Sequence, residues 1–389
     1  MLNRLALPYT DSVENAEREE RKKTSVQKMF DCAIDIVERK GVDSLSASEI
    51  VKQAGVSRPT FYSHFGDTDG LLAEFWLDRY KLWLLEICDP TNLVVAQSPE
   101  SRTLVETFLV AHRKPQIDEA IESTMPGFLE DTFPLLADRT IALWTFANRL
   151  GVIASKDVWP ITERASFLES YLDCARGKVT YLEPLEAEDL PSVAAPSDPN
   201  DHQRLIGATI QIVQKSGVNG LSVARLGRML RVTSAYIYPR IDTPEELVAE
   251  AFDIALMQAT TSNIGRWRKK NRGIESFVEY LVGGLGDPRA NWRQFRGEVL
   301  LVARHSHTLS EATRTSLDVF VGSVTKQVSL LPVPRSISRD LALLVHTLLF
   351  GFSAIHSSGI NVQNLAHTGI IRAMLAELGG RIFRGEKIR

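Results

Sequence analysis

The side chains of residues 55–65, GVSRPTFYSHF, are of the types that bind phosphates and base edges when they stand on a short helix. Ser57 can cap such a helix, and Arg58 would follow at its N-terminus, where unpaired backbone N–H groups and the helix dipole favour a phosphate. An arginine can also bind a guanine edge with two hydrogen bonds, whereas Tyr62 and His64 suit phosphate contacts that fix register. The segment therefore predicts a DNA contact. Its candidate residues are Lys52, Ser57, Arg58, Pro59, Thr60, Tyr62 and His64.

The helices that would hold this segment can be recognised from apolar spacing and from residues that begin and end helices. Apolar residues recur every three or four positions between residues 24 and 40, and Gly41 ends that helix. Ser46 and Glu49 form a capping box that begins a second helix, which Gly55 ends. Two short helices joined by a glycine turn predict a helix-turn-helix, whose second helix enters the DNA major groove.

Residues 47–75, ASEIVKQAGVSRPTFYSHFGDTDGLLAEF, resemble the N-terminal domain of the TetR/AcrR (tetracycline-repressor) family of transcription regulators. The resemblance is strong over residues 24–76 and looser over residues 200–252. It implies an all-α chain in which a fourth helix joins a helix-turn-helix head to a helical effector-binding domain. It also implies dimerisation that sets two heads one helical turn apart, and it favours a repressor that a small molecule releases from a double-stranded DNA operator.

Two features depart from the pattern of that family. Pro59 stands where the family usually has glycine, and it stiffens the start of the helix and removes a backbone donor. The lysine that usually begins the fourth helix is replaced by Thr68, and by Pro244 in the second segment. We therefore expect each head to lack one phosphate anchor.

The second segment is found when the chain is compared with itself at a shift of 176 residues, which places residues 41–76 on residues 217–252 without a gap. Nine of the 36 pairs are identical. Two amphipathic helix sets could align by chance on their apolar stripes, but Gly, Ser, Tyr and Glu do not belong to such a stripe. The pattern favours a tandem duplication. The identical pairs are Gly41/Gly217, Val42/Val218, Leu45/Leu221, Ser46/Ser222, Val56/Val232, Tyr62/Tyr238, Leu71/Leu247, Ala73/Ala249 and Glu74/Glu250.

The second head keeps contact-capable side chains but changes the turn and the end of its recognition helix. Arg231 replaces the turn glycine, and Pro239 is expected to end the helix early. The net charge is +5 over residues 201–241 and +3 over residues 21–65, which favours retained DNA binding over a decayed copy with an ordinary solvated basic face. Two unlike heads would read an asymmetric operator. The candidate residues of this head are Arg228, Thr233, Ser234, Tyr236, Tyr238 and Arg240.

Two tandem TetR-like units joined by a linker are the expected organisation. Four prolines among acidic and small residues mark residues 183–200 as the linker. A chain of 389 residues is also too long for one hydrophobic core. The expected divisions are a flexible N-terminal arm (1–23), the first head (24–70), a helical effector-type domain (71–182), the linker (183–200), a degenerate second head (201–246) and an effector and dimerisation domain (247–389).

The body of each unit carries aromatic side chains, most of which belong in a helical core. Those that could line an effector pocket favour an apolar or aromatic ligand. Residues 338–358 and 366–380 resemble the dimerisation pair of the family, and residues 161–177 are a poorer equivalent in the first half. They can pair within one chain, as a pseudo-dimer, or between two chains. The candidate pocket residues are Phe128, Trp144, Phe146, Trp292, Phe295, His305 and Phe320.

Other functional classes lack their residue patterns. On one helix, His305 and His307 would point about 200° apart, and with no third ligand spaced nearby we expect no metal site. No P-loop, dinucleotide-binding glycine motif or nucleophile elbow occurs, so we expect neither a catalytic site nor a cofactor. Three scattered cysteines, no apolar signal core and no membrane-length apolar run predict a cytoplasmic protein that does not bind membranes. The competing interpretation is a sensor or scaffold that does not bind DNA, or binds it with one head, and acts through protein partners.

Overall fold

Helices make up the regular structure throughout the described part of the chain, which in this computed structural model comprises residues 9–89, 98–159, 201–269, 290–330 and 338–358. No strand occurs in these ranges, in agreement with the expected all-α fold. The linker at 183–200 and the helical stretches expected at 161–177 and 366–380 lie outside the described residues. The helices of the first half are α1 (Tyr9–Lys40), η1 (Val42–Ser44), α2 (Ala47–Ala54), α3 (Arg58–Phe65), α4 (Thr68–Ile87), α5 (Pro99–Val110), η3 (Ala111–Arg113), α6 (Pro115–Thr132) and α7 (Leu136–Ser155).

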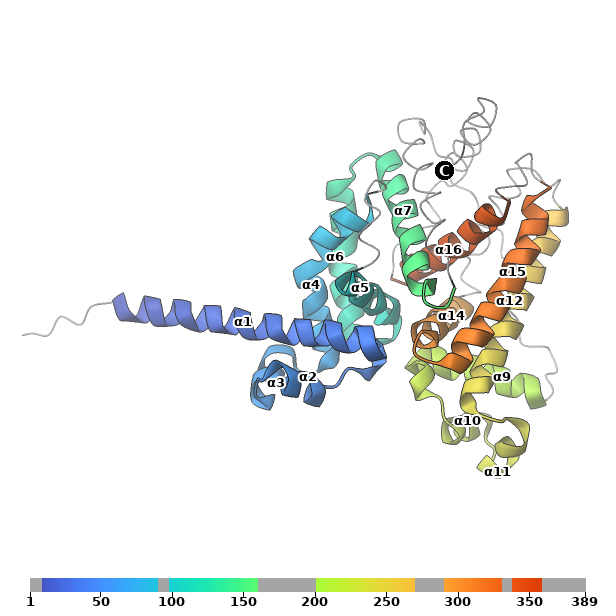
Figure 1. Ribbon diagram of the computed structural model, residues 1–389, viewed down its shortest axis with the longest axis horizontal. Helices are drawn as coiled ribbons and strands as arrows, with labels where there is room; N and C mark the ends of the chain where they lie inside the picture. Colours follow the sequence, from blue (N-terminus) through green and yellow to red (C-terminus); the bar gives the residue numbers. More distant parts are fainter. Residues whose placement is uncertain (1–8, 90–97, 160–200, 270–289, 331–337, 359–389) are drawn as a thin grey trace, which may run out of the picture.

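The second half follows a similar order of short and long helices. Figure 1 shows α2 and α3 and, further along the chain, α10 and α11 on the same lower side of the molecule, with the longer helices above them. The helices of this half are α9 (Asp201–Ser216), η4 (Val218–Gly220), α10 (Val223–Leu230), α11 (Ser234–Ile237), η5 (Tyr238–Arg240), α12 (Pro244–Lys269), α14 (Ala290–Ala303), α15 (His307–Val328) and α16 (Ser338–Ser357).

Side-chain caps fix where the helices of the first head begin. Ser46 Oγ accepts a hydrogen bond from the backbone N–H of Glu49, as the capping box predicts. Asp67 caps α4 in the same way, with 2.8 Å between its Oδ1 and the N–H of Gly70. Gly55 ends α2 in the left-handed conformation, with φ 66° and ψ 30°. These caps satisfy backbone donors that a helix start leaves unpaired.

The first helix is longer than the sequence pattern predicts. It begins at Tyr9, so residues 9–23, expected as part of a flexible arm, are helical (Figure 1). Glu, Arg and Lys dominate the sequence between residues 14 and 23, and all three are good helix formers. The apolar spacing that locates a helix against a core starts only at residue 26, and this explains why the pattern missed the extension.

An aromatic cluster holds the first head onto α4. Phe30 of α1 lies 5.9 Å from the ring centre of Phe65 on α3 and 5.3 Å from that of Phe75 on α4. Phe61 lies 5.4 Å from Phe65, and neither ring is exposed to solvent by more than 8%. Edge-on aromatic contacts of this kind stabilise a core beyond the area that they bury. The two phenylalanines of α3 thus fix the helix that carries the candidate DNA-contact residues.

The two halves pack together through α7 and α16, which cross at the centre of the molecule (Figure 1). Trp144 of α7 contacts Phe352 of α16 edge-on, with 5.3 Å between ring centres. Thr347 Oγ1 donates a hydrogen bond of 2.7 Å to Asn148 Oδ1 within this interface. By length and composition α16 alone, among the described helices, could cross a membrane, but most of it is buried against other helices of the chain.

Candidate nucleic-acid interface

Helix α3 buries its aromatic face and presents its polar face to solvent. Ser57 Oγ accepts a hydrogen bond of 3.2 Å from the backbone N–H of Thr60, which confirms Ser57 as the N-cap. Phe61 is fully buried, whereas the Tyr62 side chain is 52% exposed. A helix held by one face in this way leaves the opposite face accessible to a DNA groove.

The seven candidate residues of the first head fall within α2, its turn and α3. Arg58 Nη2 donates a hydrogen bond of 3.2 Å to Ser48 Oγ of α2. Because both side chains are at the surface, this contact positions the guanidinium without removing it from water. Ser48 was not among the predicted residues, since the sequence pattern identified this stretch only as a capping box. Lys52, Ser57, Arg58, Pro59 and Tyr62 are exposed, and Thr60 and His64 are half-buried.

The second head has the same left-handed turn between its two short helices, but an arginine occupies the position that glycine holds in the first head. Arg231 ends α10 with φ 57° and ψ 43°, the left-handed conformation that Gly55 adopts in the first head. No other non-glycine residue of the described ranges has a positive φ. The following helix, α11, has four residues and continues as the 3₁₀ turn η5 from Tyr238, as expected from Pro239. Thr233 occupies the N-cap position without a capping hydrogen bond from its side chain.

The candidate residues of the second head lie on two sides of α11. One group surrounds an open hollow between α10 and α11, together with Arg231, which was not among the predicted contacts. Tyr238 and Arg240 border a second hollow that also contains Asp242, Glu246 and Glu250. An acidic lining repels phosphate, so the first hollow is the better DNA-facing surface. Its candidate residues are Arg228, Thr233, Ser234 and Tyr236.

Arg240 makes its contacts within its own head. Its guanidinium carbon lies 3.8 Å from the ring centre of Tyr236, in a cation–π geometry. Arg240 Nη2 lies 3.6 Å from a carboxylate oxygen of Asp201, and a hydrogen bond to the same Asp201 raises the pKa of the Tyr236 phenol. Arg240 and Tyr236 must exchange these partners in order to bind phosphate. Tyr238, which is 65% exposed, is the more accessible aromatic side chain.

Within the described part of the chain, the predicted effector-pocket residues lie in separate packing contacts. Phe146 packs between Trp83 and Phe108, at 5.6 Å and 5.5 Å, in the core of the first half. His305 lies in the turn after α14 rather than on a helix, next to Gly41. The others lie in separate core contacts: Phe128 with Tyr80, Trp144 with Phe352, Trp292 with Phe252 and Phe295, and Phe320 with His346.

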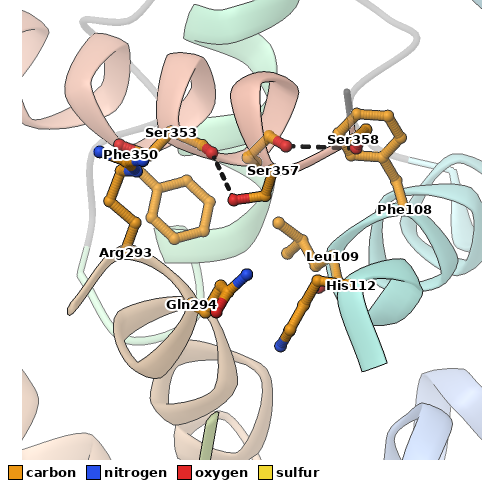
Figure 2. Close-up of a pocket in the computed structure, with 11 residues that line it drawn as sticks. Phe108, Leu109, His112, Arg293, Gln294, Phe350, Ser353, Ser357 and Ser358 are labelled. Atoms are coloured by element: carbon orange, nitrogen blue, oxygen red, sulfur yellow. Dashed lines mark hydrogen bonds between the residues drawn. The ribbon is translucent and has the colours of Figure 1, made fainter. Parts of the chain in front are cut away.

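A small cavity lies instead where α5, α14 and α16 meet. Its volume is about 20 Å³, enough for roughly one water molecule. Figure 2 shows Arg293 beside the Phe350 ring at one side and His112 and Gln294 at another. Its lining contains none of the predicted pocket residues and comprises Phe108, Leu109, His112, Arg293, Gln294, Gly297, Phe350, Ser353, Ala354, Ser357 and Ser358. Elsewhere in the described ranges, no group of three His, Cys, Asp or Glu side chains is placed to hold a metal ion.

Comparison with known proteins identifies the first head. Residues 30–75 match the model of the bacterial regulatory proteins of the TetR family. The chain is 42% identical over 50 residues to the HTH-type transcriptional regulator AcrR of Shigella flexneri, covering 13% of this chain and 23% of that protein. It is 40% identical over 46 residues to the uncharacterized HTH-type transcriptional regulator YvdT of Bacillus subtilis (strain 168), covering 12% and 24%. The chain thus spans about a quarter of the length of these relatives.

Among solved structures, the chain is matched to a transcriptional regulator from Rhodococcus sp. Rha1. The match covers 46% of this chain and 97% of that chain, with a TM-score of 0.38 and 18% sequence identity.

Proposed function

We propose, on the premise that residues 30–75 form a TetR-family N-terminal domain, that the chain is a sequence-specific DNA-binding transcription regulator. It works as a fused pseudo-dimer with two unlike heads, and a small-molecule effector modulates its binding. The observation that carries the proposal is α3, whose aromatic face is buried while Arg58 and Tyr62 are exposed. From the resemblance to the TetR family, we infer that the protein represses transcription by occluding promoters.

Sequence similarity beyond the heads supports a tandem duplication. Residues 106–111 read ETFLVA, and residues 298–303 read EVLLVA, at a shift of 192. These segments lie in α5 and η3 of one half and in α14 of the other. At a shift of 200, α7 and α16 share Ala142/Ala342, Leu143/Leu343, Gly151/Gly351 and Ala154/Ala354.

Reciprocal ion pairs across the two halves support an internal two-fold relation. Glu106 of α5 pairs with Arg304 of the second half, with 2.6 Å between Oε1 and Nη2. Glu298, which occupies the matching place on α14, pairs with Arg113 of the first half, also at 2.6 Å. At the shift of 192, Arg304 matches His112, whose Nε2 lies 3.5 Å from Glu298 Oε1, and Arg113 is the next residue. Each buried carboxylate thus meets the opposite half at matching or adjacent positions, as expected when a two-fold interface repeats its contacts.

The crossing of α7 and α16 is reciprocal as well. The backbone of Thr347 lies so close to Gly151 that a Cβ at this glycine would collide with it. The backbone of Ala147 would likewise collide with a Cβ at Gly351. At a shift of 200 residues, Gly151 matches Gly351 and Ala147 matches Thr347, so the second contact is the two-fold equivalent of the first. Small residues at such a crossing let two helix backbones approach each other closely.

An effector would act through the helices that join the heads to the body. Trp76 of α4 donates a hydrogen bond of 2.9 Å to Thr124 of α6, and Ser316 of α15 donates one of 2.8 Å to Asp253 of α12. A ligand that binds one arrangement of these helices better than another shifts the spacing of the heads. Because the heads differ at Gly55 and Arg231 and in the length of α3 and α11, we expect them to read unlike half-sites.

The proposal is tested by selecting DNA from a random pool with the purified full-length protein and determining the mass of the complex on the selected site. Two unlike half-sites about one helical turn apart, bound by a single chain, are the expected result. A palindrome bound by two chains would exclude a reading role for the second head. The absence of an enriched site at low salt would exclude DNA binding and favour the sensor or scaffold.

Substitutions in the first head, measured on the selected DNA site, test whether its candidate residues contact DNA. Arg58→Ala should weaken binding by roughly 5-fold to 150-fold, as expected for loss of about 1–3 kcal/mol from a base contact. Tyr62→Phe should weaken it less and to a similar degree on all sequences, because a phosphate contact carries no sequence information. Tyr80→Phe is the matched control, since Tyr80 packs against Trp76 and Phe128 away from the heads.

A further inference from the structure

Two basic side chains are buried where α14 crosses α16. The Arg296 residue is 5% exposed, and its guanidinium carbon lies 5.1 Å from the ring centre of Phe350. His346, one turn before Phe350 on α16, is fully buried, and its Nε2 lies 3.1 Å from Ser155 Oγ. Within the described ranges, neither Arg296 Nε nor His346 Nδ1 has a hydrogen-bond partner, and no carboxylate pairs with Arg296.

Such an arrangement is costly for folding. A buried charge without a partner loses its hydration, and a buried donor without an acceptor loses a hydrogen bond. Burial, together with the positive charge of neighbouring Arg293, lowers the pKa of Arg296 to about 9. Burial lowers the pKa of His346 to about 3, with Arg296 as the second cause. At neutral pH the site therefore holds a guanidinium cation beside a neutral imidazole.

The fold itself does not require these residues. In the register of the proposed duplication, Arg296 matches Leu104 of α5, and His346 matches Phe146 of α7. Leu104 and Phe146 are both fully buried and belong to the apolar core of the first half. The same positions are thus filled by ordinary core residues in one half and by basic residues in the other. This difference points to a ligand rather than to packing.

The small cavity described above opens along the same junction of α14 and α16. Arg296 does not line the cavity itself, but the Phe350 ring under its guanidinium forms part of the cavity wall. Arg293, one turn before Arg296, lines the cavity and is 5% exposed (Figure 2). Gln294 and Ser353 add polar side chains to the same wall. The cavity therefore has a cationic, hydrogen-bonding side and an aromatic side.

We propose that this junction binds a small anion, a carboxylate or a phosphate group, which contacts Arg293 and Arg296 and is the effector of the regulator. The assignment as an effector rests on the proposed function, whereas anion binding does not. Arginine presents a planar fork of donors that matches the oxygens of either group. Since the cavity holds roughly one water molecule, an anion larger than this must displace the Phe350 ring.

Thermal unfolding of the full-length protein tests anion binding. The probes are acetate, benzoate and inorganic phosphate at constant ionic strength, with acetamide and benzamide as neutral counterparts of the carboxylates. At least one anion should raise the Tm of the wild type by about 2–8 °C when present well above its Kd, and the amides should not. A rise with acetate or benzoate assigns a carboxylate ligand, and a rise with phosphate alone assigns a phosphate.

Arg296→Leu and His346→Phe install the residues of the first half. Both variants should fold with a Tm equal to or above that of the wild type, because an unpaired buried polar group is removed. Arg296→Leu should abolish the anion-dependent rise. Arg339→Leu, which removes an exposed arginine from the same α16, should keep it. No rise with any anion in the wild type, or a full rise in Arg296→Leu, would overturn the proposal.

DNA binding of the same variants separates the two proposals. On the selected site, Arg296→Leu should bind DNA as the wild type does but should lose the change in affinity that the anion causes. If the wild type shows the Tm rise and binds no DNA, the anion site stands and the regulator proposal fails. If it binds DNA with an affinity that the anion does not alter, the anion is not the effector.

Discussion

The turn residue of each head shows how one position sets local stability. Gly55 and Arg231 both adopt a left-handed backbone conformation, which costs an L-residue with a side chain about 1–2 kcal/mol. A Cβ at Gly55 would meet no atom within 4 Å, so only the backbone opposes a side chain there. Arg231 bears that backbone cost in the second head and places a positive charge on the hollow that we assign to DNA.

Substitutions at the two turn positions should change stability in opposite directions. Arg231→Gly should raise the free energy of unfolding by about 1 kcal/mol, and Gly55→Ala should lower it by about the same amount. Urea denaturation of both variants measures the changes. If Arg231→Gly also weakens DNA binding, the strained arginine is retained for contact with DNA; unchanged binding would exclude that role.

Burial of His346 should make stability depend on pH. The unfolded histidine has a pKa near 6.5, whereas burial lowers the folded pKa to about 3. Between these values the unfolded state binds a proton that the folded state does not. The contribution of His346 to stability should therefore fall as the pH drops below about 6.5, by at most roughly 1.4 kcal/mol per pH unit. Urea denaturation at pH 7 and pH 5 should show a smaller fall for His346→Phe than for the wild type. Equal falls would contradict a buried, neutral His346.

At the scale of elements, the crossing of α7 and α16 depends on glycine for close approach. Gly351→Ala places a Cβ against the backbone of Ala147, where neither helix can yield without separating. We expect the variant to lower Tm by several degrees, as for other overpacked interfaces that cost about 1–3 kcal/mol.

Gly322→Ala in α15 is the matched control for that substitution. Its added Cβ would meet no atom within 4 Å, and alanine favours a helix over glycine by about 1 kcal/mol. This variant should therefore keep or raise Tm. Similar Tm values for the two variants would show that α7 and α16 do not pack as closely as described.

At the scale of the whole molecule, the reciprocal ion pairs join the two halves. The side chains of Arg304 and Glu106 are 8% and 4% exposed, and Glu106 also accepts a hydrogen bond of 2.9 Å from the backbone N–H of Val42. Burial raises the pKa of Glu106 to about 7, and Arg304 opposes that rise. Removing one member of such a pair leaves the other buried without its counter-ion.

Arg304→Met should therefore destabilise the protein by about 3–5 kcal/mol. Adding Glu106→Gln should restore part of the loss, and the difference gives the coupling in a double-mutant cycle. Arg39→Met is the control, because the Arg39–Asp35 pair is 45% and 57% exposed and such pairs contribute about 0–1 kcal/mol. A loss for Arg304→Met no larger than that of the control would contradict the proposed link between halves.

The sequence by itself determined the caps and the turn of the first head. Ser46, Ser57 and Asp67 act as caps, and Gly55 ends a helix, because capping and left-handed turns depend on residues only a few positions apart. The comparison of the chain with itself at a shift of 176 residues shows no similarity past residue 76. The similar segments ETFLVA (106–111) and EVLLVA (298–303) align only at a shift of 192, so a comparison without gaps does not find them.

Only the tertiary structure decided which aromatic side chains pack together in the core and which polar side chains are buried there without a partner for every polar atom. Aromatic residues expected around a pocket, such as Phe146, pack in separate core contacts, whereas Arg296 and His346 gave no signal in the sequence. Arg296 and His346 are 50 positions apart, and Glu106 and Arg304 are 198 apart. Contacts at such separations follow from how helices pack against one another, and apolar spacing within one helix carries no information about the partner that it meets.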